Sequence, residues 1–436
     1  MTVAIAPLKL LRGRLLWFTA DPREAGESAH RYIEDGAVIV EGGLVKQAGQ
    51  ANALIGELPP NVPVEDHRPH LIMPGFIDPH IHFPQTQVIA SYGAQLLDWL
   101  NKYTFVEEQK FADPDHCARN ARFFLDELLR NGTTTAVAFC SVHPQSAEAF
   151  FAESERRNTL MLGGKVLMDR NCPDALRDTP QRGYDETKAL IARWHGRGRQ
   201  RYAIAPRFAV TSSQAQLEAA GALAREHPDC HIETHLSENR AEIALVAELF
   251  PRSRSYTDVY EHYGLLGERT LLGHCIHLSK RERKLIAKRG SVAVFCPTSN
   301  LFIGSGLFDW RATREAGIRI ALATDVGGGT SYSLLRTAGE AYKVLQLQGQ
   351  NLPALAAFHD MTLGNAVALG LQDHIGSFEK GHDCDAVVLD SGATPAMRWR
   401  LETATTLAEE LFILMTMGSD RNIVATYVMG ERAFPA

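Results

Sequence analysis

The chain has 436 residues, of which 45% are hydrophobic and 22% are charged, a composition typical of a soluble globular protein that is too long for one small core. The formal charge of −6 and the pI near 6.3 provide no broad basic surface, so a nucleic-acid-binding protein is not favoured. Arginines interrupt the apolar run at the start of the chain, and no apolar run reaches transmembrane length. We therefore expect neither a secretory signal nor a membrane span.

The cysteine pattern gives an expectation about the compartment. The seven cysteines are scattered and odd in number, and none belongs to a pair of C-x-x-C motifs. This is not the pattern of a disulfide-rich secreted protein or of a zinc ribbon. It is typical of a reducing environment, so we expect a cytoplasmic protein.

The first 70 residues are predicted to form short strands. Residues 37–49 resemble a β-hairpin whose turn is supplied by Gly42 and Gly43. No stretch of helical period and convincing length occurs in this region. The chain therefore opens with a β-rich segment.

From residue 71 onward, short apolar runs rich in β-branched residues alternate with longer stretches of helical period, which indicates repeated βα units. Eight such runs occur, in the order LIMPGFID, TTTAVAFC, GKVLMD, YAIAPRF, CHIETHL, TLLGHC, SVAVFCP and RIALATD. They span 255 residues, from Leu71 to Asp325, and an eight-stranded β/α barrel typically takes about 250. We therefore predict an α/β protein with a (β/α)8 TIM barrel at residues 71–379.

Strand-like segments return near the end of the chain, at residues 385–390 and 423–430, after a helical pattern near residues 338–348. Both chain ends are therefore β-rich and flank the barrel. The simplest assembly joins residues 1–70 with residues 380–436 as one small β-sandwich domain into which the barrel is inserted.

The first predicted barrel strand ends in a His-x-His motif. Alternation along an extended segment sends His80 and His82 to the same side, as two ligands of one ion require. Two surface or packed histidines would explain such a pair about as well if it stood alone.

Three later strand ends also carry side chains that can bind a metal, namely His235, His274 and Asp325. Barrel enzymes place their active sites at the carboxyl ends of the strands, so these groups are expected to meet. Because imidazoles and a carboxylate suit zinc best, we predict a zinc site with four ligands, His80, His82, His235 and Asp325.

Glu238 follows His235 by three residues. On leaving the strand it can return toward the ion without being a ligand, which is the position of a general acid and base. Alone, such a glutamate is more often a solvated loop charge. Its neighbour His235 favours the catalytic interpretation.

These residues resemble the amidohydrolase superfamily, whose members share the barrel, the His-x-His strand end and the later His, His and Asp positions. The resemblance covers essentially the whole chain and includes PGFIDPHIH on the first strand and TDVGGG on the eighth. It also includes a return passage with Asn365, Ala366, Leu369, Gly370, Gly376 and DAVVLD.

Within that superfamily the chain resembles the guanine deaminase family more than other members. The segments that carry this resemblance are FPQTQ (83–87), LLDWLNKYTF (96–105), GKVLMDRN (164–171) and PRF (206–208). The resemblance implies hydrolysis of guanine to xanthine and ammonia, one Zn²⁺ per chain and a homodimer. It implies catalytic roles for Glu238, Asp325 and His274. It implies that the purine is held by Gln85, Arg207, Phe208, His235 and Glu238.

The chemistry of three of these side chains suits a 6-oxopurine. Arg207 can donate to the O6 and N7 edge of guanine, whereas adenine would place a donor there. Phe208 offers a flat apolar face, and Gln85 can donate and accept at once. From sequence alone, a salt bridge, core packing and an exposed loop amide are equally good or better explanations for Arg207, Phe208 and Gln85, respectively.

Other polar residues receive plainer interpretations. We predict that Lys165 enters its strand at the amino end and therefore does not bridge two metals as a carboxylated lysine. His277 is interpreted as a loop or helix-cap histidine. Asp383 and Asp385 are interpreted as turn residues, with Cys384 as a small buried filler.

Alternatives from other classes remain open. One is a noncatalytic barrel that serves as a scaffold, although such a role would not require the ligand set and Glu238 to be intact, as they are here. Others are a deaminase that acts on oxidised guanine, another purine or a pterin, and a hydrolase that acts on triazines or amides.

Overall fold

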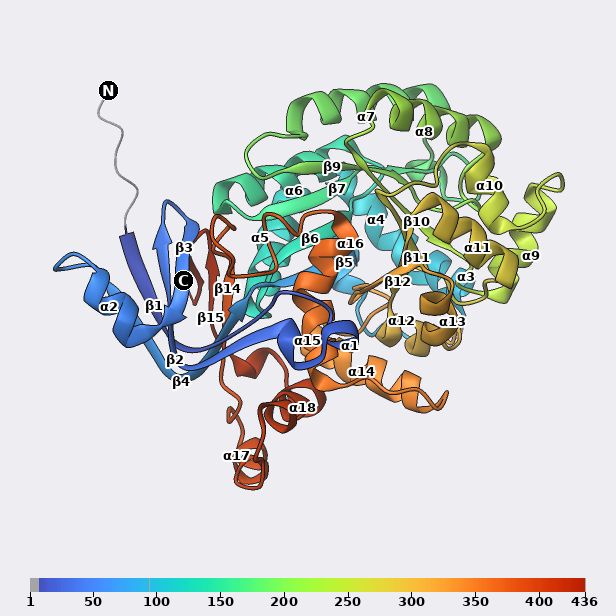
Figure 1. The fold of residues 1–436 in the computed structure, drawn as a ribbon. Helices are drawn as coiled ribbons and strands as arrows, with labels where there is room; N and C mark the ends of the chain where they lie inside the picture. The colour runs from blue at the N-terminus through green and yellow to red at the C-terminus, as the bar shows by residue number, and fades with distance from the viewer. Residues whose placement is uncertain (1–7, 94, 436) are drawn as a thin grey trace, which may run out of the picture.

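The computed structural model describes residues 8–93 and 95–435, which form a barrel of parallel strands and a separate sheet (Figure 1). The barrel strands pair in chain order. They are β5 (Phe76–His82), β6 (Thr133–Phe139), β7 (Leu160–Gly164), β9 (Arg201–Pro206), β10 (His231–Leu236), β11 (Thr270–His274), β12 (Val292–Phe295) and β13 (Arg319–Leu322), and a short β8 (Val166–Leu167) pairs with β9. The predicted β/α barrel is confirmed.

The first and last barrel strands meet at a seam. Near its carboxyl end the Asp325 amide donates to the His80 carbonyl at 3.0 Å, and the His82 amide donates to the Val326 carbonyl at 2.6 Å. These bonds bring the His-x-His motif next to Asp325. The nearly complete closure of the barrel therefore creates the central part of the site.

Asn365 joins β5 and β13 lower along the seam. Its Nδ2 donates to the carbonyls of Ile77 and Leu322 at 2.7 and 2.8 Å, and its Oδ1 accepts from the Leu322 amide at 3.0 Å. The side chain is fully buried. One amide therefore completes backbone hydrogen bonding between two strands that lack a continuous ladder there.

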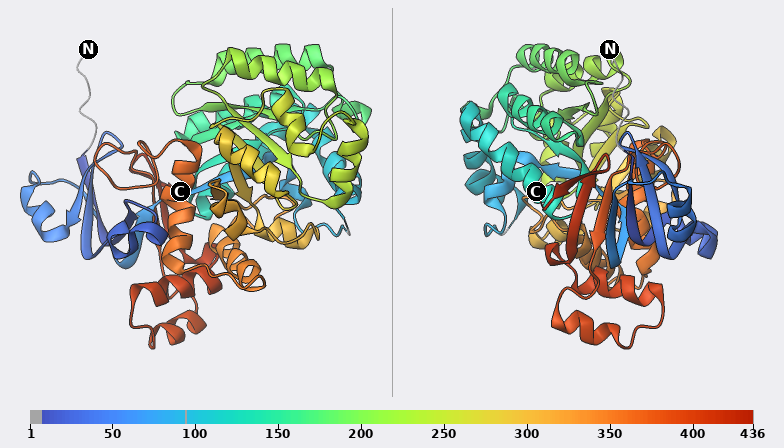
Figure 2. Two further views of the ribbon diagram at one scale, coloured as in Figure 1. Left: turned by 45° about the vertical axis from the view of Figure 1, so that its right-hand side comes forward. Right: turned by 90° about the vertical axis from the view of Figure 1, so that its left-hand side faces the viewer.

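Helices cover the outside of the barrel, as two further views show (Figure 2). Several begin at a capping side chain, such as Asn239 and Ser279, which form capping boxes with Glu242 and Glu282. Those after successive strands are α5 (Pro114–Arg130), α6 (Pro144–Arg157), α7 (Pro180–Trp194), α8 (Gln214–Glu226), α9 (Arg240–Leu249), α10 (Tyr256–His262), α11 (Lys280–Arg289), α12 (Pro297–Phe302), α13 (Trp310–Glu315) and α14 (Leu334–Gln346).

Shorter helical segments complete the structure. At the start of the chain and over the barrel mouth these are α1 (Pro22–Ala25), η1 (Gly26–Ala29), α2 (Ala51–Glu57), η2 (Phe83–Val88), α3 (Leu96–Trp99), η3 (Leu100–Thr104), α4 (Phe105–Glu108), η4 (Gln109–Ala112) and η5 (Asp174–Leu176). Toward the end of the chain they are α15 (Ala354–His359), η6 (Asp360–Gly364), α16 (Asn365–Leu369), α17 (Pro395–Leu401), α18 (Leu407–Met417) and η7 (Asp420–Asn422). None of the helices within residues 8–93 and 95–435 combines the length and apolar character needed to cross a bilayer.

The separate sheet is built from both chain ends, as expected. Its seven strands form one mixed sheet in the order β16 (Glu431–Phe434), β15 (Ile423–Val428), β14 (Ala386–Leu389), β4 (Val64–Pro74), β1 (Leu8–Phe18), β2 (His30–Glu41) and β3 (Leu44–Gln50). The predicted hairpin is confirmed, because β2 and β3 pair on either side of Gly42 and Gly43. In Figure 2 this sheet lies beside the barrel.

Two predicted strand positions were wrong. The run LIMP belongs to β4 of the terminal sheet, where it pairs with β14, and the barrel begins at Phe76. The third barrel strand is Leu160–Gly164 and precedes most of the predicted GKVLMD. Its two glycines weaken the apolar pattern of the strand, but the packing requires them. A Cβ on Gly164 would lie 2.1 Å from the Ala203 carbonyl oxygen.

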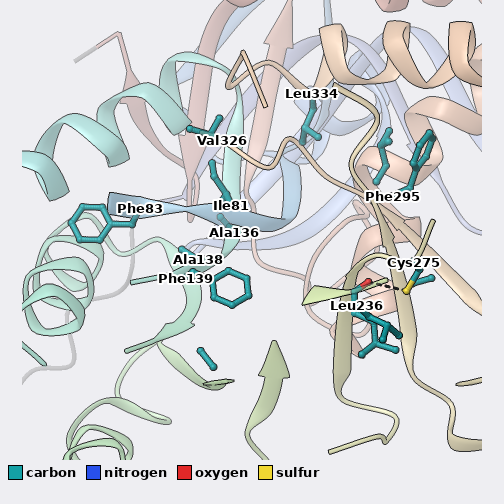
Figure 3. Packing of buried hydrophobic residues seen from close by; sticks show 14 of the residues in the cluster. Ile81, Phe83, Ala136, Ala138, Phe139, Leu236, Cys275, Phe295, Val326 and Leu334 are labelled. Carbon is teal, nitrogen blue, oxygen red and sulfur yellow. Dashed lines mark hydrogen bonds between the residues drawn. The ribbon is translucent and has the colours of Figure 1, made fainter. Parts of the chain in front are cut away.

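A large hydrophobic cluster fills the space between barrel and helices. Figure 3 shows Ile81, Phe83, Ala138, Phe139 and Val326 within it. Ile81 therefore packs into the cluster while its neighbours on β5 are free to face the barrel axis. This is the alternation expected of a strand.

Candidate active site

The first strand and the segment after the last strand bring three polar side chains together. The Nε2 atoms of His80 and His82 lie 3.4 and 3.1 Å from Asp325 Oδ1. All three side chains are at least nine-tenths buried. The His-x-His motif and Asp325 therefore converge, as the sequence predicted for two neighbouring strand ends.

The end of β10 adds His235 to this group. Its Nε2 lies 3.2 Å from His82 Nε2, and its Nδ1 lies 2.7 Å from the Arg207 carbonyl oxygen. Because a carbonyl can only accept, Nδ1 carries the proton and donates it. The Nε2 atom is left with a lone pair, which is the form that a metal ligand needs.

His274 and Glu238 face each other beside Asp325. His274 Nε2 lies 3.4 Å from Glu238 Oε2 and 3.7 Å from Asp325 Oδ2. The opposite nitrogen, Nδ1, donates to Asn300 Oδ1 at 2.9 Å, and Ser305 Oγ donates to Glu238 Oε1 at 2.7 Å. Neighbouring side chains thus fix the orientation of both candidate proton carriers.

The backbone is strained where two of these groups enter the site. His274 and Asp325 have φ angles of 71° and 52°, a region that costs a residue with a side chain about 1–3 kcal/mol. Both residues lie at or just after a barrel strand end. This conformation turns the side chains toward the centre and persists because the surrounding hydrogen bonds hold it.

Burial dominates the electrostatics of the site. It lowers the pKa of His82 to about 4 and that of His235 well below the usual range. Burial also raises the pKa of Glu238 to about 8, and the charge of Asp325 adds to that effect. For Asp325 burial opposes ionisation, yet the nearby rings of His80 and His82 keep its pKa well below the usual value. The rings of His82 and His235 are therefore held neutral.

The donor set fits a divalent metal ion. Both ring nitrogens of His80 are buried and make no hydrogen bond to any part of the described chain. Ligand atoms of His80, His235 and His274 lie within 4.8 Å of one another, as do those of His80, Cys296 and Asp325. Such a cluster of imidazoles around a carboxylate leaves the buried ring nitrogens of His80 without a partner unless a cation binds.

A pocket opens directly onto this centre. Its wall includes the predicted contacts Gln85, Arg207 and Phe208 together with His235 and Glu238. Gln85 and Arg207 are 2% and 3% exposed, so neither is a loop side chain in solvent. The remaining lining residues are His82, Leu96, Trp99, Leu100, His274, Ile303, Asp325 and Gly328.

Comparisons with known proteins decide the family. The family model described as "Amidohydrolase family" matches residues 71–433. The chain belongs to the amidohydrolase family. The guanine deaminase of Escherichia coli (strain K12) is 45% identical to this amidohydrolase over 98% of both chains.

Solved structures agree with that relationship. The structure of E. coli guanine deaminase superposes on this amidohydrolase with a TM-score of 0.94 at 44% identity, covering 98% of this chain and 99% of the other. A guanine deaminase from C. acetobutylicum, solved with guanine bound in its active site, has a TM-score of 0.88 at 30% identity and covers 98% and 100%.

Sequence reasoning missed several residues of the site. Glu108 is buried behind Arg207 and Gln85, Asn300 supports His274, and Ser305 supports Glu238. Leu96, Trp99 and Leu100 lie in a segment that was noticed only for its resemblance. A signal existed for Asn300, because it follows a barrel strand as the other site residues do, but Glu108 lies on a helical segment with no such cue.

The other polar residues considered from sequence lie elsewhere. Lys165 precedes the two-residue strand β8, as predicted, but it also follows β7, so it lies at the carboxyl end of the third barrel strand. Its ammonium is buried and pairs with Asp178 and, at 2.9 Å, with Glu186. Because both partners lie outside the candidate metal ligands, the amine is not placed as a bridging ligand.

His277 lies in a turn after β11, and its Nε2 donates to the Ser305 carbonyl at 2.9 Å. Cys384 is fully buried. Asp383 and Asp385 precede β14 but do more than form a turn, because both pair with Arg199 of the barrel, at 2.9 and 2.6 Å. These two carboxylates therefore link the terminal sheet to the barrel.

Proposed function

We propose that this amidohydrolase is a zinc-dependent guanine deaminase, which converts guanine and water into xanthine and ammonia. One observation carries the proposal: the polar wall formed by Gln85 and Arg207 borders the same pocket as Glu238, His274 and Asp325. A purine bound there would place an edge on that wall and its reacting carbon near the proton carriers. The guanine deaminases that match along 98% of this chain support the same substrate.

Zinc is the ion that the donor set favours, with His80, His82, His235 and Asp325 as its ligands. A bound divalent ion supplies Lewis acidity that makes water nucleophilic near neutral pH. The selection of these ligands rests on their buried convergence and on the lowered pKa values of His82 and His235, which keep those two rings neutral.

Recognition of the base is assigned to the polar wall and one aromatic ring. Arg207 donates to the carbonyl oxygen at C6, where adenine would present an amino group. Gln85 meets the ring edge with its amide, and Phe208 packs against the flat face of the purine. His235 and Glu238 border the base on the side of the reacting carbon.

The chain moves protons around C2 of the base. Asp325 or Glu238 accepts a proton from the attacking water, and His274 orients that water. Oxygen then bonds to C2, and Glu238 delivers a proton to the neighbouring ring nitrogen. The proton of the new C2 hydroxyl is then carried to the amino nitrogen, the C2–N bond breaks, and ammonia leaves as the C2 carbonyl of xanthine forms. A carboxyl group whose pKa lies near neutrality suits such transfers in both directions.

Two further expectations belong to the proposal. We expect a homodimer in solution, as the family resemblance implies, and a cytoplasmic location. The seven cysteines are all buried free thiols, which fits a reducing compartment. Analytical ultracentrifugation tests the first expectation, and localisation of the tagged full chain tests the second.

The assay of function uses purified, metal-loaded protein. Incubation with guanine should give loss of its ultraviolet absorbance, formation of xanthine and an equal amount of ammonia. Guanine should have the highest kcat/KM in a panel that includes adenine, an oxidised guanine, a pterin and a triazine. Absence of guanine turnover by protein that carries its metal, or a clear preference for another member of the panel, would refute the proposal.

A further inference from the structure

Glu108 is a buried acid behind the wall of the pocket. It is the last residue of α4 and is 1% exposed. It does not line the pocket, but its carboxylate contacts two residues that do, Arg207 and Gln85. These two residues come from different parts of the barrel mouth, so one carboxylate connects both halves of the polar wall.

The contact with Arg207 fixes the guanidinium. Both Glu108 oxygens accept from Arg207 Nη1, at 2.9 and 2.7 Å. Because the ion pair uses Nη1, it leaves the Nη2 group for an acceptor in the pocket. The ring of Phe105, also on α4, lies 5.4 Å from the guanidinium carbon of Arg207. The same short helix thus holds the cation by charge and by an aromatic face.

The contact with Gln85 fixes the direction of its amide. Gln85 Nε2 donates to Glu108 Oε1 at 3.0 Å, and the Gly327 amide faces Gln85 Oε1 at 3.4 Å. An ionised carboxylate can only accept, so it selects the NH2 side of the amide and prevents a 180° flip. The pocket is therefore presented with one pattern of donors and acceptors instead of two.

We propose that Glu108 is a positioning residue that determines specificity for a 6-oxopurine. It holds Arg207 so that a donor faces the C6 oxygen, and it holds Gln85 so that its amide presents one fixed pattern. A purine with an amino group at C6 would place a donor against a donor, and the rigid wall could not turn to accommodate it. This inference rests on the proposed deamination of guanine.

A pair of substrates isolates this effect. Guanine and 2,6-diaminopurine carry the same amino group at C2. They differ at C6, where one has a carbonyl and the other an amino group, and at the adjacent N1, which carries a proton only in guanine. The ratio of their kcat/KM values therefore measures recognition of the C6–N1 edge and is insensitive to damage that affects both reactions equally.

The test compares Glu108→Gln with the wild-type enzyme, both metal-loaded. The substitution keeps the shape of the side chain but removes its charge. It also places an amide donor beside the donor groups of Arg207 and Gln85. We expect KM for guanine to rise about 100-fold, kcat to fall less than about 10-fold, and the preference for guanine over 2,6-diaminopurine to fall at least about 10-fold. Metal content should be unchanged, because none of the four candidate ligands contacts Glu108.

Glu107→Gln is the matched control. Glu107 is the adjacent buried glutamate of α4, but it pairs with Lys110 at 2.6 Å and lies 3.6 Å from His116, away from the polar wall. It should keep the wild-type substrate preference. If Glu108→Gln does not fold, Glu108→Asp is the alternative, because it retains the charge but withdraws it by one methylene. It should show the same pattern, with KM for guanine raised about 10-fold.

The outcomes separate the two proposals. Wild-type protein that carries metal but deaminates neither purine would refute the proposed function. Wild-type protein that prefers guanine, together with a Glu108 variant that retains that preference, would refute the role of Glu108 alone. An equal loss of preference in Glu107→Gln, or a fall in kcat with KM unchanged, would also overturn it.

Discussion

At the scale of single residues, the site depends on partners that fix two of its imidazoles, His235 and His274. The Arg207 carbonyl accepts a hydrogen bond from His235 Nδ1, and Asn300 Oδ1 accepts one from His274 Nδ1. Each ring is therefore oriented with its Nε2 toward the centre, and His235 presents that nitrogen as a bare lone pair. Such outer contacts set ligand orientation, and their loss typically costs 10- to 100-fold in affinity or activity.

Glu238 is the residue on which the proposed proton transfers depend. Glu238→Gln should retain the metal, since its ligands are untouched, but lose about 10³-fold in kcat, because an amide cannot accept and return a proton. Steady-state kinetics with parallel metal analysis measures both. The exposed Glu248→Gln on α9 is the control and should behave as wild type. An unaltered rate in Glu238→Gln would remove this residue from the chemistry.

Gly273 leaves the space that the His80 ring occupies. A Cβ at this position would lie 2.5 Å from His80 Cε1, and the backbone of Gly273 is ordinary strand. Gly273→Ala should therefore fold but displace His80, with metal affinity falling at least about 10-fold. Competition with a chromogenic chelator measures that affinity. Wild-type affinity in this variant would show that His80 does not need its present position.

At the scale of secondary structure, the weak point of the barrel is the seam between its first and last strands. Asn365 closes it with three hydrogen bonds to Ile77 and Leu322. Asn365→Leu should leave those backbone groups unpaired in the core and cost about 3 kcal/mol or more. A lower Tm in differential scanning calorimetry is the expected result, and an unchanged Tm would show that the seam closes without this amide.

The strand positions show what a local sequence pattern can and cannot predict. The eight-strand order was predictable because each strand is a short apolar run followed by a helical period. The limits of the third strand were not, because the glycines of Leu160–Gly164 weaken its pattern and are explained only by the close approach of Ala203. Likewise LIMP has strand character, but its sequence does not say which sheet it joins.

The residues of the site likewise divide into those that the sequence could predict and those that it could not. His80, His82, His235, His274, Glu238 and Asp325 could be proposed because strand ends meet at one face of a barrel. Glu108 could not, since it is 99 residues from Arg207 in the sequence and reaches it only through the packing of α4 over the barrel mouth. Residues at the strand ends therefore follow from topology, whereas a residue that positions them, such as Glu108, follows from tertiary contacts.

At the scale of the whole molecule, buried neutral histidines should make stability depend on pH. His231 at the base of β10 donates to the Leu369 carbonyl at 2.9 Å, and burial lowers its pKa to about 4. The unfolded chain, with an ordinary histidine pKa near 6.5, binds this proton first, so stability is complete above about pH 6.5 and falls as the pH approaches 4.

The contribution of His231 to that loss is at most about 3 kcal/mol. His231→Gln keeps a donor for Leu369 but cannot take up a proton. Its Tm should therefore fall less steeply than that of the wild type between pH 7 and pH 4.5. Parallel curves for the two proteins would show that this histidine does not titrate with unfolding.

The central claim is that side chains from distant parts of the chain bind one divalent ion. The direct measurement is the metal content per chain of purified protein after zinc supplementation and gel filtration, by inductively coupled plasma mass spectrometry. The account predicts close to one zinc per chain in the wild type and nearly none in His80→Ala, with activity lost in parallel. Folded wild-type protein without stoichiometric metal, or full metal retention in His80→Ala, would contradict it.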